Sequence, residues 1–166
     1  MTPEQRLAEL GLDLPDAARP VGAYVPAVRT GDLIFTSGQI PMRNGELLAK
    51  GKVPTDVRAD IAEAATIQAA LNALAAVKQA LGDGDKPGEL SRVTRIVRMN
   101  VFVNSAPGFT EQARIANAAS ELLLAAFGQA GRHTRCAIGA AELPLDAPVE
   151  LDLVVEVREG EVGSKK

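Results

Sequence analysis

Apolar and polar residues alternate with different periods along the chain, and these periods predict the order of its elements. The stretch PEQRLAELGL predicts a short helix that ends at Gly11 and Pro15. The stretch AYVPAVRTGDLIFTSGQIP has the pattern of two strands, with a turn at RTGD between them. The next stretch, PMRNGELLAKGKVPTD, predicts a loop with a short ribbon around NGE.

A helical period begins after this loop. Thr55 or Asp56 is the expected N-cap. Apolar residues then recur on one face as far as Gly82, as expected for a long amphipathic helix: Val57, Ile61, Ala64, Ile67, Leu71, Leu74, Val77 and Leu81. GDGDKPGE predicts a linker, and RVTRIVRMNVFV has the period of a strand. A second helix is expected from about Pro107 to Phe127, ending at Gly128.

Two further strands are expected near the end of the chain. They cover Arg135–Ala141 and Val149–Val157, and ELPLDAP joins them as a hairpin. The element order is therefore two strands, a long helix, a strand, a helix and two strands. This order predicts an α+β domain with two main helices packed on one face of a single sheet.

Alternation along these strands predicts which side chains point away from the helices. The last strand contributes Glu150, Asp152, Val154 and Glu156 to this open face. The strand before it is expected to contribute Arg135, Ala137, Gly139 and Ala141, with Cys136, Ile138 and Ala140 pointing inward. The middle strand adds Ile96, Arg98, Asn100 and Phe102. This mixture is too apolar for free solvent and too polar for a core, so we expect a self-association surface.

Composition excludes several classes of function. The 166 residues predict one domain, with a helical extension over about residues 1–20 and a flexible tail over about 159–166. A net charge of -3, a single tyrosine and no tryptophan argue against a nucleic-acid partner. The N-terminus lacks the apolar run of a signal peptide and no stretch could span a bilayer, so we expect a soluble, cytoplasmic protein without a membrane partner. One cysteine and one histidine leave no disulfide framework and no zinc-ligand set.

Several stretches resemble the RidA family, also called YjgF or endoribonuclease L-PSP proteins. They are TSGQIP, RIVRMNVFV, ANAASELLLAAF and, above all, TRCAIGAAELPLDAPVELDLVVEV. The likeness runs from about Val21 to Arg158. It implies a chorismate-mutase-like fold and a homotrimer whose sheets form a central barrel with three intersubunit clefts. It also implies enamine/imine deamination, in which 2-iminobutanoate or 2-iminopropanoate is hydrolysed to the 2-oxo acid and ammonia without a metal or cofactor.

The resemblance assigns roles to five residues. Arg135 matches the arginine that holds the substrate carboxylate, and Glu150 matches the glutamate near the attacking water. Tyr24, Gly38 and Asn117 match substrate-binding positions. The chemistry agrees, because a planar guanidinium grips a carboxylate through two parallel hydrogen bonds and stays charged at any working pH. An oriented imine then needs only a water and a proton acceptor.

Three features depart from the family pattern. The loop RNGELLAKGKVP is longer, extra residues lie between Phe109 and Asn117, and Thr134 after GRH replaces the usual Pro-Ala before Arg135. All three affect the expected cleft walls and therefore the substrate preference.

Structural roles compete with these assignments. Arg135 could form an ion pair with Asp152 or Glu156, Glu150 could be a solvated strand residue, and Tyr24 a half-buried aromatic. The Cys136 thiol is expected to point toward the core, because strand neighbours face opposite sides, and His133 is expected in a loop.

The expected hairpin also separates the two catalytic candidates. It would place Glu150 opposite Ala140 or Ala141, on the order of 15 Å from Arg135. Either the pocket is long or neighbouring subunits complete it.

Two other functions remain as alternatives. One is a noncatalytic protein that uses the same Arg135 clamp to bind small carboxylates, because a fold and a site can persist while the function changes. The other is an endoribonuclease, which the acidic balance and sparse aromatic residues disfavour.

Overall fold

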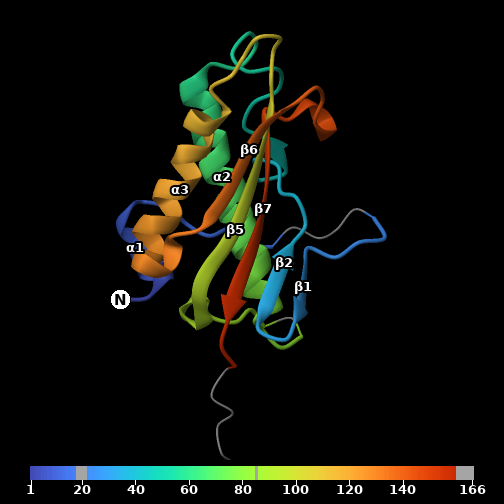
Figure 1. Ribbon diagram of the computed structural model, residues 1–166. Helices are drawn as coiled ribbons and strands as arrows, with labels where there is room; N and C mark the ends of the chain where they lie inside the picture. Colours follow the sequence, from blue (N-terminus) through green and yellow to red (C-terminus); the bar gives the residue numbers. More distant parts are fainter. Residues whose placement is uncertain (18–21, 85, 160–166) are drawn as a thin grey trace, which may run out of the picture.

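A five-stranded mixed sheet with helices on one face forms the core of the computed structural model, which describes residues 1–17, 22–84 and 86–159 (Figure 1). The strand order is β1-β2-β7-β5-β6. The strands are β1 Ala27–Thr30, β2 Leu33–Thr36, β5 Val93–Asn104, β6 Thr134–Ala140 and β7 Val149–Val157. The helices are α1 Pro3–Glu9, α2 Ala59–Ala80 and α3 Gln112–Phe127. The predicted α+β class and element order are therefore confirmed.

The first part of the chain follows the sequence pattern closely. β1 and β2 form the expected hairpin, with Gly31 at a φ of 56° in the turn. The expected ribbon around NGE pairs β3 (Met42–Arg43) with β4 (Glu46–Leu47). Asn44 and Gly45 both have positive φ there, as a two-residue hairpin turn of this type requires. Residues 18–20 of the expected extension and 160–166 of the expected tail lie outside the described residues.

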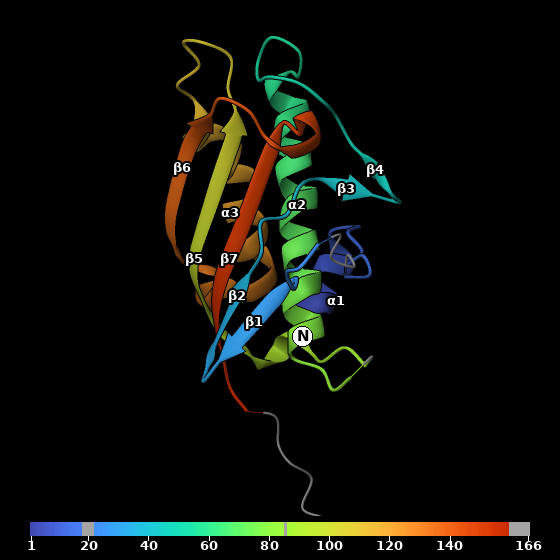
Figure 2. The ribbon, with the colours of Figure 1, turned by 90° about the vertical axis from the view of Figure 1, so that its right-hand side faces the viewer.

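The last two strands do not form a hairpin. β6 pairs in parallel with β5, and β7 pairs antiparallel with the other edge of β5. Figure 2 shows β5 lying between them. The reason is that β5, α3 and β6 form a crossover unit, which brings β6 back beside β5 in the same direction. The connection over residues 141–148 then passes across the end of β5 to reach β7.

The long helix α2 is buried on nearly every side over its middle part. The expected caps Thr55 and Asp56 are wrong, because α2 begins at Ala59 with Arg58 as its N-cap. Ile61 was expected on the buried face but is 44% exposed. Small residues are buried instead: Ala62, Ala65, Ala69, Ala70, Ala73 and Ala76. These alanines let the sheet and α3 approach α2 closely.

The second long helix, α3, begins later than expected. Residues 106–109 form a turn in which the Phe109 N–H donates to the carbonyl of Ala106 (3.1 Å), and the helix starts at Gln112 rather than near Pro107. It ends at Gly128 as expected, with a φ of 60° at that residue. None of the described helices is both long and apolar enough to cross a membrane.

A bulge in β5 changes one predicted face. The pairing of β5 with β7 shifts register between Ile96 and Arg98, and Ile96 is completely buried opposite Val155. Ile96 therefore belongs to the helix-covered core and not to the open face. A bulge inserts one extra residue, so strict alternation fails on its N-terminal side. Beyond it, Arg98, Asn100 and Phe102 lie on the open face as expected, beside Val154, Asp152 and Glu150.

Candidate active site

Arg135 lies on the helix-covered face of β6, opposite to the expected side. Its Nη1 donates to the Asn117 Oδ1 (2.8 Å) and to the Ser120 Oγ (3.1 Å), both on α3. Two residues further along, Ala137 packs against the core. At Gly139 a Cβ atom would lie 2.9 Å from the Ser105 Oγ, which confirms the same orientation. By alternation, Cys136, Ile138 and Ala140 therefore face the open side.

This orientation rules out two predictions. Asp152 and Glu156 lie on the open face, and no ion pair within the described part of the chain includes Arg135. The alternative interpretation, in which Arg135 forms a structural ion pair with Asp152 or Glu156, is therefore wrong. The Cys136 thiol does not point toward the core, because Cys136 pairs with Asn100 on the open face.

The hydrogen bonds of Arg135 leave one edge of its guanidinium open. Nη1 carries two hydrogens, and Asn117 and Ser120 accept both. Among residues 1–17, 22–84 and 86–159, the Nε and Nη2 groups of Arg135 have no acceptor. Nε–H and the neighbouring Nη2–H point in the same direction from one edge of the plane. This edge presents the two parallel donors that match a carboxylate.

The bulge in β5 also positions Arg135. The Thr134 hydroxyl donates to the carbonyl of Val97 (2.8 Å), which lies within the irregular part of β5. Met99 pairs directly with Arg135 and is fully buried. The start of β6 is therefore attached to β5 at the bulge and directly after it, while Arg135 reaches toward α3. We call Arg135, Asn117 and Ser120 the Arg135 cluster.

Glu150 lies on the open face of the sheet, beside Gly38. The side chain is half-buried, and a Cβ atom at Gly38 would lie 2.0 Å from the Glu150 Oε1. Only a residue without a side chain lets this carboxylate occupy its position. The Thr36 hydroxyl accepts the Leu153 N–H (2.9 Å), and Gln39 exchanges two backbone hydrogen bonds with Leu151. These bonds hold the segment around Gly38 against β7.

The environment of Glu150 favours its protonated form. Burial raises the pKa of the Glu150 carboxyl above its ordinary value, and the nearby Asp152 carboxylate raises it further. Burial also raises the pKa of Asp152, although a hydrogen bond from Asn100 and the charge of Arg98 oppose the rise. The Glu150 carboxylate is thus a better proton acceptor than that of an ordinary glutamate.

The Tyr24 side chain is largely exposed to solvent. Tyr24 precedes β1 and is 57% exposed, which is more than the half-buried aromatic that was considered. The Ser37 hydroxyl donates to the carbonyl of Val25 (2.6 Å), so the segments that carry Tyr24 and Gly38 are connected. We call Glu150 and Gly38 the Glu150 cluster.

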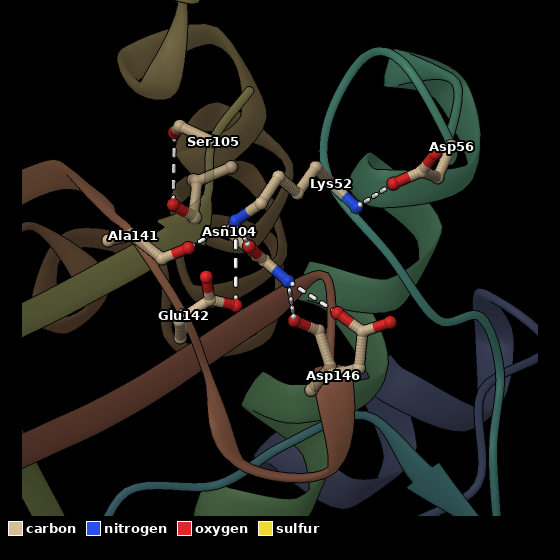
Figure 3. A network of polar contacts seen from close by, with 9 residues as sticks. Lys52, Asp56, Asn104, Ser105, Ala141, Glu142 and Asp146 are labelled. Atoms are coloured by element: carbon tan, nitrogen blue, oxygen red, sulfur yellow. Dashed lines mark hydrogen bonds and ion pairs between the residues drawn. The ribbon is translucent and has the colours of Figure 1, made fainter. Parts of the chain in front are cut away.

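A polar network around Lys52 fixes the turn that leads into β7 (Figure 3). The Lys52 ammonium donates to the Asn104 Oδ1 (2.9 Å) and to the carbonyl of Ala141, and it lies 3.6 Å from the Glu142 carboxylate. Asn104 is fully buried, and its amide nitrogen donates to the Asp146 side chain (3.1 Å). The loop that carries Lys52 therefore supports the turn before Glu150.

The two clusters do not meet within one chain. Arg135 faces α3, whereas Glu150 lies on the opposite face of the sheet with β5 between their strands. The structure thus brings Asn117 to Arg135 and Gly38 to Glu150, but it keeps the two catalytic candidates apart. The distance expected between Arg135 and Glu150 assumed that β6 and β7 form a hairpin. Because these strands do not pair with each other, that distance does not apply.

Two hollows of about 540 and 290 Å³ border α1, and neither is lined by Arg135 or Glu150.

Ser120 and His133 are polar neighbours of Arg135 that sequence reasoning did not assign to the site. The Ser120 Oγ lies 3.1 Å from the His133 Nε2, and the His133 Nδ1 lies 2.7 Å from the carbonyl oxygen of Gly131. The spacing of Asn117 and Ser120, three residues apart on one helix, is a signal that both face the same neighbour. That signal becomes useful only when β6 is known to face α3.

The fold and the placement of these residues define a class of protein: a chorismate-mutase-like α+β domain with an arginine on an edge strand and a glutamate on a central one. Residues 4–157 match the family model described as "YjgF/chorismate_mutase-like, putative endoribonuclease". The chain belongs to this family, and the resemblance seen in its sequence is confirmed.

Known relatives support the same assignment. The chain is 43% identical to protein TCP17 of Trypanosoma cruzi over 152 residues, which are 91% of each chain. It is 30% identical over 139 residues to the 2-iminobutanoate/2-iminopropanoate deaminase of Escherichia coli K12, covering 84% of this chain and 91% of that one. The crystal structure of Atu1372 from Agrobacterium tumefaciens, a protein of unknown function, has a TM-score of 0.86 at 43% identity, covering 94% of this chain and 92% of that one. The family therefore includes proteins named as imine deaminases at a more distant level of similarity.

Proposed function

We propose that this protein is an imine deaminase that hydrolyses 2-imino acids, such as 2-iminobutanoate or 2-iminopropanoate, to 2-oxo acids and ammonia. The observation that carries the proposal is the open Nε–Nη2 edge of Arg135, held in place through Nη1 by Asn117 and Ser120. Two parallel donors on a permanent cation suit the carboxylate of a 2-imino acid. The E. coli relative named for this activity supports the choice of substrate class.

Glu150 supplies the proton transfers in this mechanism. Water attacks the imine carbon and forms the new C–O bond while the Glu150 carboxylate takes a proton from the water. The C=N electron pair moves onto the nitrogen, which enters as the protonated iminium, and the nitrogen of the resulting carbinolamine then receives the proton from Glu150. Glu150 next takes the hydroxyl proton while the C=O bond forms and the C–N bond breaks, and this proton leaves with the ammonia as ammonium. The raised pKa of Glu150 makes its carboxylate a better proton acceptor than that of an ordinary glutamate, as this step requires.

The proposal requires two subunits for each site. Arg135 and Glu150 lie on opposite faces of one sheet, so a single chain cannot present both to one small substrate. The open face is partly apolar, with Val28 53%, Phe35 43% and Ile138 47% exposed, as in a surface that is covered by association. A homotrimer, in which the Arg135 cluster of one subunit meets the Glu150 cluster of the next, would satisfy both requirements.

A trapping assay tests the activity. An amino-acid oxidase generates the 2-imino acid in situ, and semicarbazide traps the imine that remains. Added protein should lower semicarbazone formation, whereas the Arg135→Ala variant at equal concentration should not. Unchanged trapping with the native protein would refute deamination.

One observation favours a second candidate, a noncatalytic carboxylate-binding protein. The Arg135 cluster is complete within one chain and does not need Glu150 to hold a carboxylate. Calorimetry with 2-oxobutanoate separates the two candidates. Binding that depends on Arg135, together with unchanged trapping, would support the binding protein and exclude the enzyme.

A further inference from the structure

A chain of hydrogen bonds leads from Arg135 through Ser120 to His133. The carbonyl of Gly131 can only accept, so the His133 Nδ1, at 2.7 Å, must carry the ring proton. When the ring is neutral, Nε2 therefore has a lone pair, and the Ser120 hydroxyl at 3.1 Å can only donate to it. With its hydrogen directed at His133, the Ser120 oxygen turns a lone pair toward the Arg135 Nη1.

The backbone around His133 is held at a fixed distance from α3. Gly131 is buried, and a Cβ atom there would lie 2.2 Å from the carbonyl oxygen of Leu123. Only glycine allows the chain to approach the helix so closely. Since Leu123 lies about one turn from Ser120 on α3, this contact places the imidazole beside the Ser120 hydroxyl.

We propose that Ser120 and His133 are positioning residues for the Arg135 clamp: the Nδ1–H tautomer of His133 directs the Ser120 hydroxyl, whose oxygen fixes Nη1 and leaves the Nε–Nη2 edge open for a ligand carboxylate. This inference rests on the proposed role of Arg135. It adds two residues that do not touch the ligand and act through the guanidinium. Without the hydrogen bond to His133, the Ser120 hydroxyl could rotate to a carbonyl of the preceding helical turn, as helical serines commonly do.

The tautomer can be measured directly, because the chain contains a single histidine. Protein labelled with ¹⁵N-histidine and made without a polyhistidine tag gives one pair of ring signals. At alkaline pH, where an ordinary imidazole is neutral, we expect Nδ1 to bear the proton and Nε2 to be bare. Ser120→Ala should shift the Nε2 signal, while the control Glu121→Gln, at an exposed neighbouring position on α3, should not. A dominant Nε2–H tautomer in the native protein would overturn the proposal.

Binding of 2-oxobutanoate measures the effect on the clamp. Ser120→Ala should raise its Kd about 5-fold, the loss expected for one hydrogen bond of ordinary strength. Ser120→Thr keeps the hydroxyl and should restore binding to within about 2-fold of native. His133→Ala should weaken binding in the native background but add nothing to Ser120→Ala, because His133 acts only through Ser120.

The controls distinguish failure of the Arg135 binding site from failure of the positioning role of Ser120 and His133. Melting temperatures of all variants show whether they fold, and Glu121→Gln should bind as the native protein does. If Arg135→Ala still binds 2-oxobutanoate with native affinity, the proposed site itself is wrong. If Arg135→Ala abolishes binding while Ser120→Ala keeps the native Kd, only the positioning role of Ser120 and His133 is refuted. The same conclusion follows if the effects of the Ser120 and His133 substitutions on Kd simply add.

Discussion

Two inactive variants should restore each other in mixed oligomers, because Arg135 and Glu150 lie on opposite faces of one subunit. Arg135→Ala removes the clamp but keeps the carboxylate, and Glu150→Gln does the reverse. Loss of a desolvated bidentate contact is worth roughly 2 to 5 kcal/mol, so the clamp variant alone should retain at most about 3% of native activity. We expect a comparable loss for the variant without a proton acceptor.

The fraction of activity that is restored follows from how often complementary subunits become neighbours. The two variants are refolded together in equal amounts. A cleft is then complete when a subunit with Arg135 meets a neighbour with Glu150. Each condition holds for half of the subunits, so about a quarter of the clefts should be active. The fraction does not depend on the number of subunits in the ring, because each cleft draws one group from each of two neighbours.

A second mixture verifies that subunits exchange. Native protein refolded with the double variant Arg135→Ala/Glu150→Gln should fall from a half of native activity, as an unmixed sum, to about a quarter when the subunits mix. Both mixtures are measured by semicarbazide trapping. If this control shows mixing while the two single variants together stay inactive, a site shared between subunits is wrong.

Four other changes should give the following results. Glu150→Gln should raise the melting temperature at neutral pH, because the raised pKa of Glu150 means that its ionised carboxylate weakens folding there. The difference between the two proteins should vanish as the pH falls through the raised pKa to below the ordinary value of 4.5, where Glu150 is neutral in the folded and the unfolded state. Arg135→Lys should be nearly as inactive as Arg135→Ala in the trapping assay, with unfolding free energies within about 1 kcal/mol of native, since the site needs a fork and not only a charge. Gly38→Ala should fold normally but lose deaminase activity, because the new Cβ displaces the flexible Glu150 carboxylate. Lys52→Met should lower the unfolding free energy by about 1 to 3 kcal/mol in denaturant titrations, since it leaves the buried Asn104 oxygen without its donor; Lys50→Met, in the same loop but exposed, is the matched control.

Elements with strong local signals could be predicted from the sequence. The NGE ribbon, the β1–β2 hairpin and the end of α3 at Gly128 all depend on residues that favour positive φ or on clear alternation. The start of α2 could not be predicted, because Asp56 accepts the backbone N–H of Lys52 and not one from the helix. A cap depends on a single hydrogen bond, and tertiary contacts decide which donor it receives.

The pairing of the last strands could not be predicted for a different reason. Both possible arrangements, a hairpin and two strands on either side of β5, bury the same apolar face of β7. Leu151, Leu153 and Val155 are fully buried in the observed arrangement, as expected from either one. The choice depends on β5, whose two edges are both paired along most of its length. Alternation within a strand carries no information on its neighbours.

Alternation failed in β6 because the residues on its helix-covered face are small. Ala137 and Gly139 look like positions near solvent, whereas Ile138 looks like a core residue and is 47% exposed. The same small residues let β6 approach α3, since a Cβ at Gly139 would lie within 3.0 Å of the Gln112 amide nitrogen as well as the Ser105 oxygen. Only at this short distance can Arg135 reach both of its partners on α3. The small residues are therefore part of the candidate site: they set the strand-to-helix spacing that fixes one edge of the guanidinium and leaves the other open.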